Sequence, residues 1–198
     1  MKKKNRFTIY LIIMGFVLFL TNSCKKDEKN DPSNQKPTTK DTIGQPYQGG
    51  IIAYILQSGD PGYDTNVQHG LIAAAVDQST GANWGCSGTA IAGSEGIVLG
   101  TGFQNTISIV YVCKTAGIAA RLCGDLVMGG FSDWYLPSKD ELNKLCLKKD
   151  KVGGFASGFY WSSSEANNST AWSQNFASGG QNYFPKGNSY NVRAIRTF

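Results

Sequence analysis

The chain has 198 residues, of which 17% are charged and 12% aromatic, and it contains 24 Gly. These values lie in the globular range and exclude a disordered chain or a collagen-like repeat. The formal net charge is +5, but Lys2, Lys3, Lys4 and Arg6 supply four of these charges, so residues 24–198 carry only +1. Because a nucleic-acid-binding surface needs clustered positive charge, we exclude DNA and RNA as partners.

The N-terminal segment has the pattern of an export signal. Its basic start is followed by an apolar run of about 14 residues, from Phe7 to Leu20. A membrane-spanning helix needs roughly 20 apolar residues, so this run is too short to stay in a bilayer. We therefore predict that residues 1–23 are a signal peptide that is removed.

A cysteine directly follows this segment, in the sequence Leu20-Thr21-Asn22-Ser23-Cys24. The stretch resembles a bacterial lipoprotein cleavage site, where that cysteine becomes lipidated; an ordinary secretory signal with a free Cys24 is the alternative. Lys25 to Glu28 resemble the charged signals that send some Gram-negative lipoproteins to the outer face of the outer membrane, although a merely solvated charge run has the same composition. The resemblance implies an outer-membrane lipoprotein that faces the cell exterior and is held by acyl chains on Cys24.

Polar residues dominate the next segment. From Lys25 to about Gln48 the chain consists mainly of Lys, Asp, Asn, Pro, Thr and Gln. Such a composition cannot bury enough apolar surface to offset the entropy of ordering. We predict a lipidated cysteine and disordered tether over residues 24–48 and a folded domain over residues 49–198.

Apolar patterning predicts the first elements of this domain. Residues 50–56 and 70–76 are short apolar runs typical of buried strands, and a long Gly, Ser and Thr-rich connection follows over residues 77–105. Apolar residues spaced by three and four then predict one broken helix or two successive helices around Gly117. The residues that set this period are Ile107, Val110, Cys113, Ile118, Ala119, Leu122, Cys123 and Leu126.

A capping box marks the next helix. In Ser138-Lys139-Asp140-Glu141, the Ser138 side chain accepts from the Glu141 backbone N–H, and Glu141 reaches back to Ser138. The two adjacent carboxylates are explained by this cap and by the helix dipole, so we do not assign them to acid–base catalysis. Beyond this helix, residues 159–165, 171–176 and 190–198 have the composition of strands.

Four cysteines remain after Cys24, an even number that permits disulfides in an oxidising compartment. They include no Cys-x-x-Cys pair, so zinc is not indicated. In one continuous helix Cys113 and Cys123 would lie about 15 Å apart, which is too far for a bridge. We favour a disulfide between Cys86 and Cys113 and expect Cys123 and Cys146 to act as small core residues.

Ordered motifs in the second half of the chain point to a family. They are Gly130–Ser138 (GFSDWYLPS), Glu141-Leu142, Tyr160–Glu165 (YWSSSE), Ala171-Trp172 and Val192–Arg196 (VRAIR). Together they resemble the exported domain family that includes the C-terminal domain of the collagen-like adhesin Lcl. The resemblance implies one α+β domain with a C-type-lectin-like fold related to the formylglycine-generating enzymes, in which the strands at 50–56 and 190–198 are neighbours in one sheet.

The end of the chain also resembles lipoproteins whose lectin-like C-terminus is rewritten by a diversity-generating retroelement. In such systems Asn-type template codons change to Asn, Ser, Thr, Ala, Gly, Asp, Tyr, Phe or Pro, and the variable stretch here would span about residues 160–191. An Asn and Ser-rich loop with no such history is the alternative. The expected ligand-binding residues, all within this reachable set, are Ala166, Asn168, Ser169, Ser173, Asn175, Ala177, Ser178, Asn182, Tyr183, Phe184, Pro185, Asn188, Tyr190 and Asn191.

Residues outside the reachable set would form a fixed scaffold. They are Trp161, Glu165, Trp172, Gln174, Gln181, Lys186 and the closing arginines. We expect one exposed face that carries Tyr183, Phe184, Tyr190, Asn168, Ser173 and Asn175. We expect Trp161 and Trp172 to lie beneath that face, because exposed Tyr and Phe in Asn-rich loops are typical binding anchors.

The sequence favours binding over catalysis. No cysteine follows Cys146, whereas the formylglycine-generating enzymes use late cysteines, and His69 is the only histidine, which predicts a structural role and no metal site. The prediction is a non-enzymatic surface lipoprotein without cofactor or metal, which binds an unknown protein or glycan on another cell, phage or host surface. The alternatives are an adhesin of fixed specificity for glycans or matrix and a degenerate enzyme.

Overall fold

The computed structural model describes residues 42–198, whose strands form two sheets. The predicted signal peptide, Cys24 and most of the predicted tether lie outside the described residues. The first sheet has the order β1-β2-β3-β9 and is antiparallel throughout. Its strands are β1 (Pro46–Tyr47), β2 (Gly50–Ile55), β3 (Gly70–Ala73) and β9 (Ile195–Thr197).

The second sheet has the order β4-β8-β5-β6-β7, in which β5 and β8 run parallel and the other pairs antiparallel. Its strands are β4 (Ser79–Ala82), β5 (Phe159–Glu165), β6 (Thr170–Asn175), β7 (Gln181–Pro185) and β8 (Tyr190–Val192). Sequence patterning predicted β5 and β6 but not β7, whose Asn and Pro content is atypical of strands.

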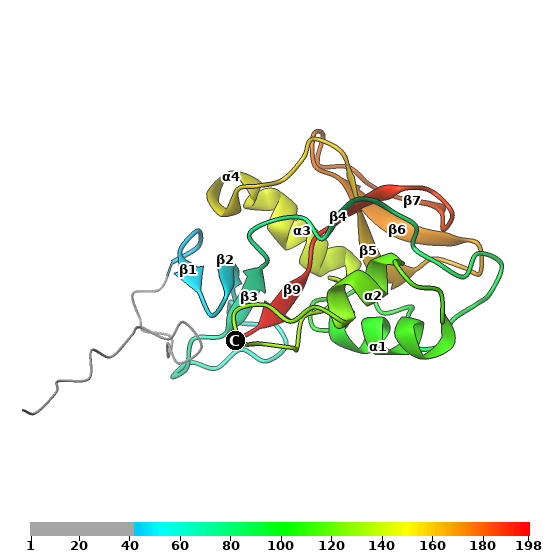
Figure 1. The fold of residues 1–198 in the computed structure, drawn as a ribbon. Coiled ribbons are helices and arrows are strands. Elements are labelled where there is room, and N and C mark those ends of the chain that lie inside the picture. Colours follow the sequence, from blue (N-terminus) through cyan, green and yellow to red (C-terminus); the bar gives the residue numbers. More distant parts are fainter. Residues whose placement is uncertain (1–41) are drawn as a thin grey trace, which may run out of the picture. The chain divides into compact units, whose positions relative to one another are not determined.

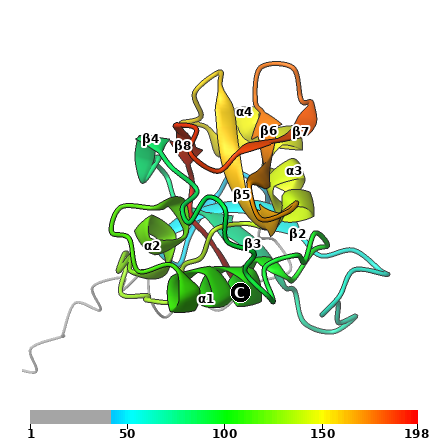
Figure 2. The ribbon, with the colours of Figure 1, turned by 90° about the vertical axis from the view of Figure 1, so that its right-hand side faces the viewer.

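Helices pack against both sheets within the described chain (Figure 1). They are α1 (Gly102–Val112), α2 (Ala119–Gly124), α3 (Lys139–Leu147) and α4 (Lys149–Val152). Figure 2 shows α3 beside β6 and β7 and α2 nearer to β4 and β8, whereas α1 packs against β5. Residues 42–198 thus form one mixed α+β domain, as predicted.

The folded domain begins earlier than residue 49. Tyr47 is 4% exposed and lies edge-on to Phe198 with ring centroids 5.2 Å apart. The Gly44 N–H donates to the Ile52 carbonyl at 2.8 Å, and Ile43 packs against the core. Residues 42–48 therefore belong to the domain and not to the predicted tether. The side chains of Ile43 and Tyr47 pack against the core and hold this otherwise polar segment on the domain.

The predicted closing strand, residues 190–198, is divided between the two sheets. β8 ends at Val192, and β9 starts at Ile195 in the other sheet. Between them the Arg193 guanidinium is buried and donates to Asp77 Oδ1 at 2.7 Å. The expectation that the first and last strands are neighbours is wrong: they share a sheet, but β3 lies between β2 and β9. β2 pairs with one edge of β3, so β9 takes the other edge.

Two successive helices form around Gly117, as predicted, but the first buries a different face. Ile107 is 45% exposed, whereas Asn105, Thr106 and Ile109 are buried. The Asn105 side chain donates to Gly96 O at 2.6 Å and to Ser163 Oγ at 3.2 Å. Polar anchors, and not the apolar period, therefore set the rotation of α1 about its axis.

Local chemistry at α3 and at the cysteines follows the sequence closely. The capping box is complete: the Glu141 N–H donates to Ser138 Oγ at 3.3 Å, and the Ser138 N–H donates to Glu141 Oε2 at 2.7 Å. Cys86 and Cys113 form the favoured disulfide, with Cα atoms 5.8 Å apart, and the free Cys123 is buried. The disulfide ties the long connection after β4 to the end of α1.

Candidate ligand-binding face

The predicted variable stretch, about residues 160–191, covers most of β5, the hairpin of β6 and β7 and the start of β8. Asn167 Oδ1 accepts from the N–H groups of Ser169 (2.9 Å) and Thr170 (3.0 Å), and Asn175 Oδ1 accepts from Ala177 (2.8 Å) and Ser178 (3.0 Å). These Asx turns are a local reason for asparagine at both ends of the hairpin. Asn182 Oδ1 likewise accepts from a neighbouring backbone group, the Tyr183 N–H, at 2.9 Å.

An aromatic cluster, here called the aromatic platform, consists of Phe159, Phe184 and Tyr190. Phe159 stacks on Tyr190 with ring centroids 5.1 Å apart, and Phe184 meets the two rings edge-on at 4.9 Å and 5.6 Å. All three side chains are half-buried. Because each ring supports the others, the platform offers rigid apolar area at low entropic cost.

Polar groups surround the platform. Asn182 is exposed, and its neighbour across the hairpin, Ser173, is 1% exposed and donates to the Asn182 carbonyl at 3.3 Å. Asn188 donates to the Tyr190 hydroxyl at 2.9 Å. Trp161 lies beneath, as predicted: it is 0% exposed, its indole N–H donates to Ala82 O at 2.9 Å, and its ring lies 4.6 Å from that of Tyr190.

Tyr183 does not share this face. Consecutive residues of a strand point to opposite sides of the sheet, so Tyr183 and Phe184 are separated. Tyr183 pairs across the hairpin with Trp172, and their rings meet edge-on at 5.3 Å. The Lys139 ammonium, from α3, lies over the Trp172 ring at 4.8 Å. The single face expected from the sequence is therefore two faces, and the half-buried Trp172 belongs to the second one instead of lying under the first.

The expected ligand-binding residues are mostly accessible. Eight are exposed: Ala166, Asn168, Ser169, Ala177, Ser178, Asn182, Tyr183 and Pro185. Five are half-buried: Asn175, Phe184, Asn188, Tyr190 and Asn191. Ser173 is the buried exception, which contradicts its placement on an exposed face.

The residues expected to be fixed form the support of the hairpin. Lys186 is 0% exposed, and its ammonium pairs with the buried Glu165 carboxylate and donates to Thr89 O at 2.8 Å. Glu165 Oε2 in turn accepts from the Ile91 N–H at 2.9 Å. This buried pair connects β5, the end of β7 and the long connection after β4. Its two charges offset each other in a site that excludes water.

The amide side chains of the scaffold hold the hairpin against α3. Gln181 donates to Lys139 O at 2.8 Å, and Gln174 donates to Asn143 Oδ1 at 3.3 Å. Sequence reasoning missed Phe159 as a platform residue and Lys139 as a neighbour of Trp172. Phe159 stands two residues before Trp161 in a predicted strand, so alternation could have placed it. No local pattern could have brought Lys139 there from another element.

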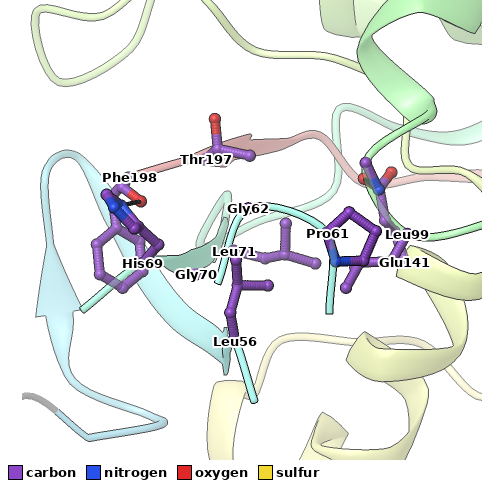
Figure 3. A pocket seen from close by; sticks show the side chains of 11 residues that line it. Leu56, Pro61, Gly62, His69, Gly70, Leu71, Leu99, Glu141, Thr197 and Phe198 are labelled. Atoms are coloured by element: carbon purple, nitrogen blue, oxygen red, sulfur yellow. Dashed lines mark hydrogen bonds between the residues drawn. The ribbon is translucent and has the colours of Figure 1, made fainter. Parts of the chain in front are cut away.

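A separate pocket of about 360 Å³ lies between the loop after β2, the end of the chain at Phe198, the loop before α1 and Glu141 of α3. Glu141 lines one end, and His69 and Phe198 lie at the other (Figure 3). His69 Nδ1 lies 3.0 Å from Phe198 O. Glu141 is fully buried, which raises the pKa of its carboxyl group although the N–H groups of Gly100 and Ser138 donate to it. Glu141 and His69 thus lie at opposite ends of the pocket (Figure 3).

Residues 42–198 contain neither a cluster of metal-ligating side chains nor a helix that could span a membrane. Within 42–198, no group of three or more His, Cys, Asp or Glu side chains is placed to hold a metal ion. In the same range no helix combines the length and the apolar character that crossing a bilayer requires.

Comparison with solved structures identifies a similar fold. A fimbrial protein from Bacteroides ovatus ATCC 8483 superposes with a TM-score of 0.53 over 79% of this chain. The match covers 45% of that protein, so this chain spans less than half of its length, and the sequences are 17% identical. The similarity therefore concerns the fold alone. No curated protein matches the chain in sequence.

A family model agrees with the motifs. The model described as Lcl C-terminal domain matches residues 73–196, a range that runs from the end of β3 into β9 and includes the platform and the whole hairpin. This range is more than half of the 198 residues. The chain belongs to the Lcl C-terminal domain family.

Proposed function

We propose that this chain is a lipid-anchored, adhesin-like protein of the bacterial surface, whose lectin-like domain binds a ligand through a diversified hairpin. The domain itself carries no catalytic step in this proposal. Its ligand is a protein or glycan on another cell, phage or host surface. Membership of the Lcl C-terminal domain family supports a role in adhesion.

One observation carries the diversification part of the proposal. Codon accessibility divides the last forty residues into changeable and fixed sets without reference to structure, and most of the changeable residues are exposed, although Ser173 is buried. Glu165, Gln174 and Lys186 are buried, whereas eight of the fourteen expected contact residues are exposed. A surface that varies while its support is fixed retains its fold, because exposed substitutions change stability little.

The chemistry of the platform favours a ligand with apolar and polar groups together. Phe184 and Tyr190 supply stiff aromatic area, and Asn182 supplies both a donor and an acceptor beside it. The second face adds Tyr183, which is 51% exposed. Because the platform and Tyr183 lie on opposite faces of the hairpin, a ligand could contact the hairpin from both sides.

Population sequencing tests diversification. Codons 160–191 are sequenced from many independent cultures of the source bacterium, together with the flanking DNA. We expect substitutions at Asn182 and Tyr183, none at Lys186 or Gln174, and a nearby reverse transcriptase gene with an imperfect repeat of this region. An invariant hairpin without such a repeat would support the adhesin of fixed specificity instead.

Labelled palmitate tests the anchor independently. The label should enter through Cys24, and Cys24→Ala should abolish it and release the protein from membranes. Protease added to intact cells should remove the domain if it faces the exterior. A Cys24→Ala variant that stays labelled and membrane-bound would contradict the anchor, whatever the outcome for the hairpin.

Binding is tested on a glycan array and on a panel of intact bacterial cells. Asn182→Ala with Tyr183→Ala should weaken any signal at least about tenfold, the effect of losing roughly 1.4 kcal/mol at a contact centre. Tyr63→Ala is the matched control, since Tyr63 is 40% exposed on the distant loop between β2 and β3. Equal losses in the two variants would show that the hairpin is not the contact.

A further inference from the structure

The helix α1 exposes large apolar side chains on the side that points away from the core. Phe103, Ile107 and Tyr111 are 47%, 45% and 77% exposed and recur every four residues. Residues at this spacing lie along one face of a helix. Single exposed apolar residues are ordinary, but a continuous stripe on a monomeric surface marks a binding surface.

The stripe borders a groove of about 510 Å³. Trp134 and Tyr135, which are 1% and 2% exposed, line its inner wall, and Val110 adds apolar surface from α1. This volume lies within the roughly 300–1,000 Å³ that is usual for small-molecule sites. The groove lies on α1 and α2 and shares no lining residue with the hairpin, so its role is independent of the proposed function.

The polar groups of the inner wall are already satisfied. The Trp134 indole N–H donates to Met128 O at 3.2 Å, and the Thr106 hydroxyl donates to Gly102 O at 2.8 Å. An occupant therefore gains little from hydrogen bonds along the wall. An extended peptide would leave its backbone groups unpaired there, whereas an apolar body fits without such a cost.

Positive charge collects at one end of the groove. Arg121 is held by hydrogen bonds to Cys113 O (3.2 Å) and Val110 O (3.0 Å), and it pairs loosely with the exposed Asp125 at 3.9 Å. Lys114 lies over the Tyr111 ring at 5.1 Å and, within residues 42–198, has no carboxylate at ion-pair distance. Two cations against one carboxylate leave this end with a net charge of +1.

We propose that the α1–α2 groove binds a small amphipathic anion. The apolar body of the ligand lies between Phe103, Ile107 and Trp134, and its carboxylate, sulfonate or phosphate group meets Lys114 and the fixed guanidinium of Arg121. Charge complementarity selects the anion over a neutral molecule of the same shape. The preformed apolar wall supplies most of the affinity.

Two fluorescent probes test the groove in the chain from residue 24 with Cys24→Ala, which removes acyl chains. Anilinonaphthalene sulfonate is the anionic probe and Nile red the neutral one. Ile107→Asp should weaken binding of both at least about tenfold. Lys114→Gln should weaken the anionic probe by about threefold, as expected for an exposed charge pair, and leave the neutral probe unchanged. Both substituted side chains lie at the surface, and thermal unfolding checks that the fold is intact.

Val127→Asp is the matched control, because Val127 is 72% exposed and does not line the groove. It should leave both affinities unchanged. A loss equal to that of Ile107→Asp would indicate general adsorption and overturn the proposal, as would unaltered binding in Ile107→Asp. Analytical ultracentrifugation compares the oligomeric state of the unchanged protein with that of Ile107→Asp. A dimer that this substitution dissociates would show that a second copy, not a small anion, covers the stripe.

Discussion

Trp161 and Tyr183 are both aromatic residues of the second sheet, yet their surroundings differ completely. Trp161 is 0% exposed and hydrogen-bonded to Ala82 O, whereas Tyr183 is 51% exposed. Trp161→Ala should lower the free energy of unfolding by about 3–5 kcal/mol, the usual effect of emptying a large aromatic site. Tyr183→Ala should lower it by less than about 1 kcal/mol. Urea denaturation followed by circular dichroism measures both.

Replacing Phe184 and Tyr190 of the platform together with Tyr183 should lower the stability of the domain. The sequence alone predicts that Ala at Tyr183, Phe184 and Tyr190 together leaves thermal stability nearly unchanged. The ring contacts of Phe184 and Tyr190 with Phe159 contradict this, because two half-buried members of one cluster would be lost. Binding experiments should therefore use Asn182 and Tyr183, which are exposed.

Within residues 42–198, the free thiols of Cys123 and Cys146 give a second prediction at this scale. Burial raises the pKa of Cys123 strongly and that of Cys146 as well, and the two residues are 0% and 7% exposed. Because the thiolate is the reactive form, iodoacetamide at pH 8 should label neither thiol quickly in the native protein. Cys146 should react before Cys123, and urea should make both react. Mass spectrometry of the alkylated peptides checks the order; faster labelling of Cys123 would contradict the burial described here.

At the scale of elements, the ion pair of Lys186 and Glu165 holds the connection between β4 and α1 against the second sheet, through bonds to Thr89 and Ile91. Lys186→Met removes the ammonium and leaves the Glu165 carboxylate, which is 5% exposed, without its cation. The expected loss of stability is about 3–5 kcal/mol, because an uncompensated buried charge remains. Adding Glu165→Gln to the same chain should recover part of that loss. Chemical denaturation of the three proteins measures the difference.

Lys139→Met is the control for this prediction. Its ammonium lies 3.8 Å from the Asp140 carboxylate in a pair that is partly exposed to solvent. Such pairs contribute about 1 kcal/mol or less. If Lys186→Met and Lys139→Met changed stability equally, the buried pair would not hold the connection.

At the scale of the whole molecule, the last seven residues join the two sheets. Truncation after Asn191 removes β9 and the buried Val192, Ala194 and Ile195, and it leaves Asp77 without the Arg193 guanidinium. The shortened chain should be unfolded, because it loses apolar burial and exposes the edge of β3. Removing only Thr197 and Phe198 should give a folded but less stable protein. Near-ultraviolet circular dichroism distinguishes the two results.

Several features could be predicted because they depend on neighbours in the chain. The capping box at Ser138 and Glu141 formed as expected, and β5 and β6 follow from aromatic and apolar patterning. The order of the motifs from Gly130 to Arg196 sufficed for the family, which the model match over residues 73–196 confirms. These features depend on residues close together in the chain or on the order of motifs along it, so they can be predicted without knowledge of tertiary contacts.

Other features depended on contacts between distant residues. The rotation of α1 about its axis follows from the hydrogen bonds of Asn105 to Gly96 and Ser163. Tyr183 and Phe184 lie on opposite faces because they belong to β7, a strand that the Asn-rich sequence did not predict. The sequence by itself determined the capping and the family, and it favoured the disulfide that the structure contains. Only the tertiary structure decided which side chains meet, since side-chain contacts depend on strand register and helix rotation, and these are set by long-range packing and buried polar bonds.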